Sequence, residues 1–192
     1  VETTRITIKN PENRERKIFE FDSAFDTHSE QNEIFDVVGE KVLLDAYKGY
    51  NTCVFAYGQT GSGKTFTMMG ADNNYGLIPR ICNELFIRQP SHNGLDKKGC
   101  QFEYRLEVSY LEIYTENVRD LLNHKNVDLK VRNHNELGPY VEGLSKVAVN
   151  NYAMISALIE KGNSLRATAS TNMNARSSRS HAILTLHFTQ LI

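Results

Sequence analysis

The fold is decided by one stretch of sequence, Gly58-Gln59-Thr60-Gly61-Ser62-Gly63-Lys64-Thr65. It matches G-x-x-x-x-G-K-[ST], the pattern of a phosphate-binding loop. Glycines let backbone N–H groups turn inward around phosphate oxygens, where a Cβ atom would clash or forbid the dihedral angles. Lys64 is a mobile cation for the β- and γ-phosphates, and the Thr65 hydroxyl can bind Mg²⁺, which prefers hard oxygen ligands. We therefore expect these residues to bind a nucleotide together with Mg²⁺.

The sequence on either side of this loop supports the same interpretation. Residues 52–57, TCVFAY, form a short apolar run that predicts a strand buried on both faces. A helix is expected after the loop, with its positive N-terminal end toward the phosphates. The alternative is a glycine-rich turn that matches by chance, which the preceding strand makes less attractive. The loop alone does not choose among kinases, GTPases, ATPases and motors.

Composition excludes several other classes of protein. The chain has 192 residues, 40% of them hydrophobic, and a formal net charge of -1 from 22 basic and 23 acidic side chains. That balance argues against a mainly electrostatic nucleic-acid binder. No apolar run approaches the ~18 residues of a transmembrane helix, and the start lacks the apolar core of a signal peptide. The three cysteines suggest neither a disulfide framework nor a zinc site, which favours a reducing, cytosolic setting.

Hydrophobic periodicity predicts alternating strands and helices along the chain. Strands are expected at 5–9, 17–25, 102–110 and 182–192, with a turn at 10–13 and a polar loop at 71–75. Helices are expected from a cap at Thr27 to near Gly49, after Pro79, and after Asn150 or Asn151, the last carrying Ile155, Leu158 and Ile159. Residues 129–149 predict a β-hairpin around Gly138-Pro139. These elements predict an α/β fold of the P-loop type, in three layers around a central mixed sheet. Because the chain starts abruptly and stops inside a strand, we expect it to be truncated at both ends.

A second polar segment reads Asn172-Met173-Asn174-Ala175-Arg176-Ser177-Ser178-Arg179-Ser180-His181. Loops that sense the γ-phosphate are rich in small hydroxyl and amide groups, which can close on a metal–phosphate pair without adding like charge. A loop of this composition can equally be an ordinary solvated connection. Its place between a helix and a strand is where switch loops often lie.

Together, FAYGQTGSGKTFTMMG (55–70) and NMNARSSRSH (172–181) resemble the P-loop and switch I of kinesin motor domains. Further similar segments are GYN (49–51), GLIPR (76–80), EVSYLEIYTENVRDLL (107–122) and GPYVEGL (138–144), so the resemblance spans nearly all of the chain. The segments 131–149 and 180–190 most resemble the Unc-type, vesicle-transporting kinesins, the third family. The resemblance implies that residues 1–192 are a partial motor domain, with the P-loop at 58–65 and switch I at 172–181.

The resemblance also implies roles for single residues. Residues 58–65 would hold ATP and Mg²⁺, and Phe66 would pack on the adenine. Asn174, Ser177 and Ser178 would close on the γ-phosphate, with Ser178 sharing the Mg²⁺ with Thr65. Arg179 would pair with a glutamate of switch II. Lys130, Arg132 and Lys146 match a tubulin-facing loop, although scattered solvated charges are the plainer interpretation of these three.

By resemblance, the function is that of a plus-end-type motor ATPase that couples ATP hydrolysis to movement along microtubules. The expected setting is cytoplasmic and cytoskeletal, with tubulin as partner, cargo or cargo adaptors bound through a tail outside this sequence, and no nucleic acid. Two family motifs are missing from the sequence, the first-strand R-x-R-P and the switch II D-x-x-G-S-E. The fragment alone is therefore expected to be inactive.

One alternative is a kinesin-like microtubule-binding protein without turnover. The other is a different P-loop ATPase or GTPase, although the guanine-reading N-K-x-D motif is absent.

Overall fold

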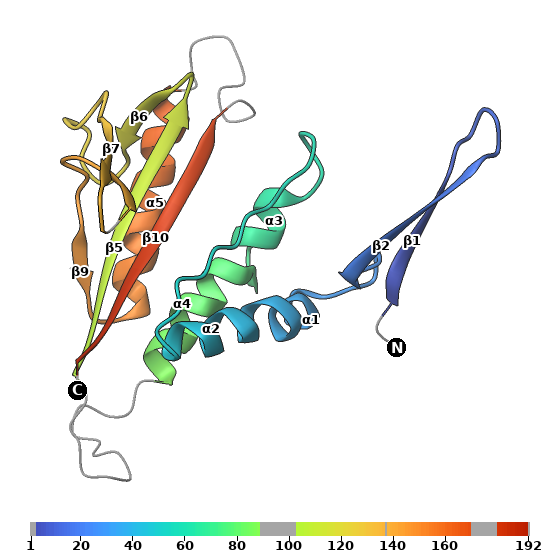
Figure 1. Ribbon diagram of the computed structural model, residues 1–192, viewed down its shortest axis with the longest axis horizontal. Helices are drawn as coiled ribbons and strands as arrows, with labels where there is room; N and C mark the ends of the chain where they lie inside the picture. Colours follow the sequence, from blue (N-terminus) through green and yellow to red (C-terminus); the bar gives the residue numbers. More distant parts are fainter. Residues whose placement is uncertain (1–2, 89–102, 137, 170–179, 192) are drawn as a thin grey trace. The chain divides into compact units, whose positions relative to one another are not determined.

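The computed structural model describes residues 3–88, 103–136, 138–169 and 180–191, and Figure 1 shows its helices and strands. The chain forms two compact units, residues 1–81 and residues 82–192. Each unit has its own secondary structure, and the phosphate-binding loop belongs to the first.

The first unit begins with a β-hairpin, as the alternating pattern predicts. Strand β1 (Thr3–Lys9) pairs antiparallel with β2 (Arg16–Ala24). The predicted turn between them is confirmed. Its Asn10 side chain accepts a hydrogen bond from the Glu12 backbone N–H at 2.8 Å, and the Asn10 backbone N–H donates to the Glu15 carbonyl at 2.8 Å. An asparagine that bonds to its own backbone two residues on is the usual way this residue type starts a turn.

The helical part of the first unit comprises α1 (Gln31–Ile34), a π-helical turn η1 (Phe35–Gly39) and α2 (Glu40–Tyr47). The predicted end near Gly49 is confirmed, and Gly49 has a φ of 84°. The predicted cap at Thr27 is wrong. The helix instead begins after Glu30, whose backbone N–H donates to the Glu33 carboxylate at 3.0 Å. A separate turn precedes the helix, because the Asp26 carboxylate accepts a hydrogen bond from the backbone N–H of His28 at 2.7 Å.

Residues 52–57 are not a strand, which corrects the sequence-based expectation. They carry no strand pairing in the described part of the chain, and Phe55 and Tyr57 are 80% and 94% exposed. An apolar run becomes a buried strand only when neighbouring strands take up its backbone hydrogen bonds. The sequence pattern reports the apolar character of the run but not the presence of those neighbours.

After the phosphate-binding loop the first unit continues with α3 (Lys64–Met69) and a small hairpin of β3 (Gly70–Ala71) and β4 (Asn74–Tyr75). The hairpin lies where a polar loop was expected. Helix α4 (Leu77–Ile87) follows, and it begins two residues earlier than Pro79. Proline is tolerated there because the N–H groups of the first helical turn have no partner within the helix.

The second unit is built on β5 (Glu103–Tyr114) and β10 (His181–Leu191), which pair antiparallel from His181↔Ile113 to Leu191↔Glu103. Both strands confirm the sequence-based expectation, and β5 continues beyond the expected 102–110. On its other side β5 pairs with β6 (Asn117–Asp120) and β9 (Val147–Val149). The result is an antiparallel sheet centred on β5.

The predicted hairpin exists as β7 (Val131–His134) and β8 (Gly138–Val141), although it is shorter than 129–149. Its turn precedes Gly138-Pro139, which open β8 instead of forming the turn. All strand pairs in the described residues are antiparallel, and they form four separate sheets. The expected central mixed sheet does not occur among the described residues, because every strand pair there is antiparallel.

Helix α5 (Tyr152–Ala169) packs against β5 and supplies the core of the second unit. Asn151 caps it, since its side-chain oxygen accepts the Met154 N–H at 2.9 Å, which confirms one of the two predicted caps. Ile155 and Ile159 are buried, as expected. The adjoining apolar cluster consists of Tyr110, Leu121, Leu122, Val147, Leu158, Leu165 and Leu184. Gly162 lets the helix approach the strand, because a Cβ atom there would lie 2.4 Å from the Tyr110 ring.

Candidate nucleotide-binding site

The loop of residues 58–65 has the backbone shape that its glycines predict. Gly61 and Gly63 have φ values of 82° and 89°, a region that other residues rarely adopt. At position 58 glycine is required for space as well as for its φ angle, because a Cβ atom there would lie 2.4 Å from the Ser62 hydroxyl. Residues with a Cβ atom would clash or be strained at these positions, so the tight backbone of this loop requires glycine there.

Lys64 lies across this loop. Its ammonium group donates to the carbonyl oxygens of Gly58 at 2.9 Å and Gln59 at 2.6 Å. Within the residues that the structure describes, Lys64 forms no ion pair with a carboxylate. Its positive charge is thus held at the loop by neutral groups, which a phosphate can replace with a stronger, charge-assisted partner.

The residues after Lys64 lie on α3, as the motif predicts. Thr65 is exposed, and Phe66 is 48% exposed, so its ring has an open face. Because α3 has only six residues, its dipole contributes less to anion binding than a longer helix would. The glycine loop and Lys64 therefore carry most of the site's preference for phosphate.

Gln31 of α1 supports this arrangement, although no sequence motif indicates it. Its side-chain N–H donates to the Phe66 carbonyl oxygen at 2.6 Å, and the residue is 2% exposed. The bond ties the start of α1 to the helix that carries Thr65 and Phe66. A single glutamine in a helical first turn has no motif, so only the structure identifies it.

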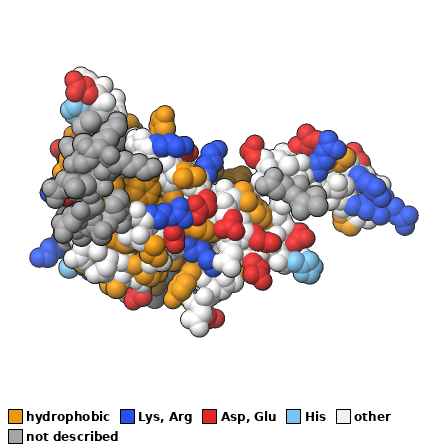
Figure 2. All heavy atoms as spheres, turned by 90° about the horizontal axis from the view of Figure 1, so that it is seen from below, with side chains coloured by type: hydrophobic (Ala, Val, Ile, Leu, Met, Phe, Trp, Pro, Cys, Tyr) orange, Lys and Arg blue, Asp and Glu red, His pale blue; other side chains and the backbone are white. Residues whose placement is uncertain are grey.

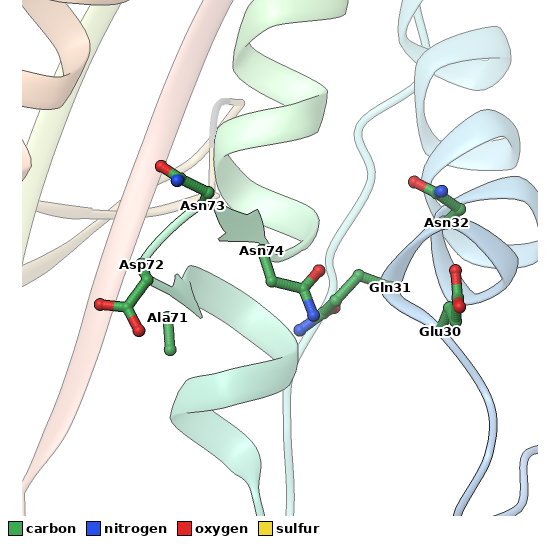
Figure 3. Close-up of a pocket in the computed structure, with 7 residues that line it drawn as sticks. All are labelled: Glu30, Gln31, Asn32, Ala71, Asp72, Asn73 and Asn74. Atoms are coloured by element: carbon green, nitrogen blue, oxygen red, sulfur yellow. The ribbon is translucent and has the colours of Figure 1, made fainter.

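A pocket of about 560 Å³ adjoins Gln31, and Figure 3 shows the side chains of Gln31 and Asn74 pointing toward each other in it. It is lined by Glu30, Gln31, Asn32, Ala71, Asp72, Asn73 and Asn74. The side-chain oxygen of Gln31 is buried and has no hydrogen-bond partner among the described residues. Two carboxylates and no cation line this pocket, so it repels phosphate and does not extend the phosphate site.

The predicted γ-phosphate-sensing residues Asn174, Ser177, Ser178 and Arg179 lie outside the residues that the structure describes. The description resumes at Ser180, just before β10. The Ser180 hydroxyl accepts a hydrogen bond from Arg166 of α5 at 3.1 Å, and Arg166 also contacts the Glu112 carboxylate of β5 at 3.3 Å. No sequence pattern indicates Arg166 and Glu112, because the two residues lie 54 positions apart.

The three basic residues proposed to face tubulin do not form a bare basic patch. Lys130 pairs with Asp128 at 3.3 Å, and Arg132 pairs with Glu142 at 3.0 Å. Lys146 is exposed and lies beside β9. In Figure 2, several Lys and Arg side chains lie next to Asp and Glu side chains on the face shown. The pairs reduce the positive field that these residues can offer an acidic surface.

The protein side of a Mg²⁺ site is modest. No group of three or more His, Cys, Asp and Glu side chains that could hold a metal ion occurs in the described residues. A hard cation at this loop would take its oxygens from Thr65, water and phosphate, which is the usual way Mg²⁺ is held beside a nucleotide. The donor set therefore fits Mg²⁺ that arrives with a nucleotide better than a resident metal ion.

Among the described residues, the longest and most apolar helices still fall short of what crossing a membrane requires.

Comparison with known proteins agrees with this loop. The sequence profile described as the kinesin motor domain matches residues 1–191. This chain belongs to the kinesin motor domain family. Curated relatives include kinesin-like protein KIF1B of Homo sapiens, 47% identical over 98% of this chain, and kinesin-like protein Klp98A of Drosophila melanogaster, 52% identical over 90% of it. The chain covers only 11% and 13% of those two proteins.

Solved kinesin structures share the fold. A KIF14 dimer with AMP-PNP in complex with a microtubule superposes with a TM-score of 0.81 at 40% identity, covering 97% of this chain and 53% of that one. The structure of a fast kinesin gives a TM-score of 0.82 at 39% identity over 91% of this chain and 49% of that one. This kinesin chain thus spans about half the length of these solved structures, and its fold class is that of P-loop kinesin motors.

Proposed function

We propose that this chain is the ATP-binding part of a microtubule-based motor that couples ATP hydrolysis to movement. One observation carries the proposal. The Lys64 ammonium group lies on the backbone of a glycine loop, held by the carbonyl oxygens of Gly58 and Gln59 and by no carboxylate in the described residues. A cation placed in this way is available to the phosphates of a bound nucleotide, and the family match supports ATP as that nucleotide.

Three residues at the loop would then have chemical roles. Lys64 would exchange the loop carbonyls for the β- and γ-phosphates, the Thr65 hydroxyl would bind Mg²⁺, and the ring of Phe66, just after the loop, would pack on the adenine. Phosphoryl transfer passes through a loose transition state, so the protein contributes mainly positioning and charge stabilisation. We assign residues 172–181 to switch I, with Asn174, Ser177, Ser178 and Arg179 responding to the γ-phosphate.

The proposed partner is the microtubule, as for the KIF14 chains whose solved structures are complexes with a microtubule. Because Lys130 and Arg132 are paired with acidic side chains, we assign them a minor part in that contact, with Lys146. The KIF1B and Klp98A relatives support the Unc-type class. The proposal includes a cytoplasmic, microtubule-associated location, cargo or adaptor binding outside these residues, and residues 1–192 as part of one motor domain.

The experiment is direct binding of a fluorescent ATP analogue with Mg²⁺ to the chain. Lys64→Ala should weaken binding by about tenfold to a hundredfold, because a charge-assisted hydrogen bond contributes about 1.5–3 kcal/mol. Lys48→Ala is the matched control, since Lys48 is an exposed lysine that pairs with Asp45 at 3.5 Å. If Lys64→Ala binds as tightly as the control, the loop is not the phosphate site.

Two further measurements separate the alternatives. Competition of ATP against GTP tests the GTPase alternative, which the kinesin profile already disfavours. Phosphate release by a longer protein containing residues 1–192, with and without microtubules, tests the alternative of microtubule binding without turnover. A longer protein that binds microtubules and ATP yet releases no phosphate would favour that second alternative.

A further inference from the structure

The turn end of the β1–β2 hairpin carries a cluster of basic side chains. Residues 9–17 read KNPENRERK, with four basic side chains against two acidic ones in a chain whose net charge is -1. All four basic residues are exposed, and Figure 2 shows Lys and Arg side chains gathered at this end of the hairpin. We call Lys9, Arg14, Arg16 and Lys17 the tip cluster.

The charge of the tip cluster is not cancelled by neighbouring carboxylates. None of its four members forms an ion pair within the part of the chain that the structure describes. The Glu15 carboxylate instead accepts a hydrogen bond from the Asn13 side chain at 3.3 Å. Lys130 and Arg132 differ in this respect, because each is paired with an acidic side chain. The tip cluster therefore offers an acidic partner a stronger positive field than those two residues do.

The strand register places two of these cations directly opposite each other. Lys9 of β1 faces Arg16 of β2 in the antiparallel ladder. Like charges in this arrangement destabilise a strand pair, whereas opposite charges stabilise it. The same hairpin has the favourable arrangement farther from the turn, since Arg5 lies opposite Glu20 and forms an ion pair with it at 2.7 Å. The stability of the hairpin therefore does not explain why Lys9 and Arg16 are both basic.

The turn holds the tip cluster in a defined shape. The Asn10 backbone N–H donates to the Glu15 carbonyl oxygen at 2.8 Å, and the Arg14 N–H donates to the Asn10 carbonyl oxygen at 3.0 Å. The Asn13 side-chain oxygen accepts the Glu15 N–H at 3.0 Å. Arg14 has a φ of 59°, a left-handed conformation that glycine adopts more easily. A cation thus occupies a position where the backbone alone would favour glycine.

We propose that the tip cluster is a docking surface for a partner rich in carboxylates, the acidic outer surface of a microtubule. The inference rests on the proposed function, in which the microtubule is the partner, and it names a contact that no sequence motif indicates. The like-charged pair and the arginine at positive φ are local costs, which carboxylates of the partner offset when they lie beside the cations. The contact supplies association with the microtubule and no step of ATP turnover.

Co-sedimentation of the 192-residue chain with polymerised tubulin, at several salt concentrations, tests this surface. Lys9→Glu is the sharpest variant, because it places a carboxylate opposite Arg16 and should not destabilise the hairpin. Lys9→Glu/Arg16→Glu keeps a like-charged pair and reverses its sign. The matched controls are Lys41→Glu and Lys41→Glu/Lys48→Glu, which change the net charge equally at exposed lysines of the same unit. Thermal unfolding and binding of a fluorescent ATP analogue are measured for every chain.

Wild type should bind microtubules at low salt and lose that binding as ions screen the contact. Lys9→Glu should weaken binding about twofold to fivefold and the double variant about fivefold to twentyfold, because lost attraction is joined by repulsion. The unfolding temperature of Lys9→Glu should equal or exceed that of wild type, so unfolding cannot explain its weaker binding. Both controls should bind microtubules as wild type does.

The contrary outcomes separate this inference from the function on which it rests. If the Lys9 variants bind microtubules like wild type, or if the controls weaken binding equally, the docking surface is wrong while the proposed function stands. A wild-type chain that does not bind microtubules at low salt would also overturn the inference. Vesicles of anionic phospholipid are the second ligand, and a Lys9→Glu effect on vesicles alone would show that the partner is a membrane. Failure of wild type to bind the ATP analogue would instead contradict the proposed function.

Discussion

Gly162 is the residue whose missing side chain allows α5 to lie against Tyr110. A Cβ atom there would lie 2.4 Å from the Tyr110 ring, and Tyr110 is further held by a 2.8 Å hydrogen bond to Asn163. The helix and the ring cannot both keep their positions if this glycine gains a methyl group. At this position the usual penalty for glycine in a helix is offset by close packing.

We expect Gly162→Ala to lower the free energy of unfolding by about 1–3 kcal/mol, because overpacking a well-filled core forces shifts. In an exposed helix the same change would raise it by about 0.5–1 kcal/mol. Urea denaturation of the chain measures the difference. Ala157→Gly, at an exposed position of the same helix, reports the propensity effect alone. A Gly162→Ala chain that is more stable than wild type would contradict the packing argument.

Single residues differ in how well their roles could be predicted from the sequence. The glycines of residues 58–65 and Lys64 follow from a motif whose spacing reflects one backbone shape. Gln31 and Arg166 act through contacts with residues far away in the sequence, at separations of 35 and 54 positions. Such contacts depend on the packing of elements, so no local pattern indicates them.

At the scale of elements, strands β5 and β10 are linked by a part-buried polar pair. The Ser109 hydroxyl and His187 Nε2 are 3.1 Å apart, and Ser109 is 2% exposed. Burial lowers the pKa of His187 below its ordinary value of 6.5, the charge of Lys146 lowers it further, and Glu107 opposes both. The folded chain therefore favours the neutral imidazole.

This pKa shift predicts a pH dependence of stability. As the pH falls below about 6.5, the unfolded chain binds a proton at His187 before the folded chain does. The free energy of unfolding should thus decrease with falling pH until the folded-state pKa is passed. His187→Gln should flatten this dependence in thermal unfolding between pH 5 and 7.5, with the exposed His28→Gln as control. An unchanged slope in His187→Gln would show that His187 does not cause it.

Strands were predicted correctly where the residues on one face are apolar and those on the other face are polar. The alternation in β1, β2, β5 and β10 is visible in the sequence because the side-chain period of a strand is two. The strand predicted at residues 52–57 is wrong, because an all-apolar run carries no such alternation and strand formation there depends on neighbouring strands. The cap of the first helix was misplaced by three residues because Thr27 and Glu30 both fit a capping pattern, and Asp26 had already formed a turn.

At the scale of the whole chain, the nucleotide loop and the antiparallel sheet belong to different compact units. The 192 residues contain no D-x-x-G-S-E sequence, and two of the three candidates for a tubulin contact, Lys130 and Arg132, are paired with Asp128 and Glu142. We infer that ATP binding and the response to a microtubule depend on different parts of the sequence.

We therefore expect the chain alone to bind ATP but to show no phosphate release that microtubules stimulate. The measurement is phosphate release at several salt concentrations, with and without polymerised tubulin, because charge-based binding is screened by salt. A longer kinesin motor of known activity serves as the positive control. A several-fold stimulation of the chain by microtubules at low salt would refute the expectation.

The ladder between β5 and β10 has a consequence for synthesis on the ribosome. Ser109 and His187 touch in the sheet but are 78 residues apart in the chain. At about 5–20 residues per second, β5 leaves the ribosome roughly 4–16 seconds before its partner strand does. During that interval one edge of β5 is unpaired and open to other nascent chains. We therefore expect the nascent chain to need chaperones mainly during this delay, whereas the β1–β2 hairpin can close as soon as it emerges.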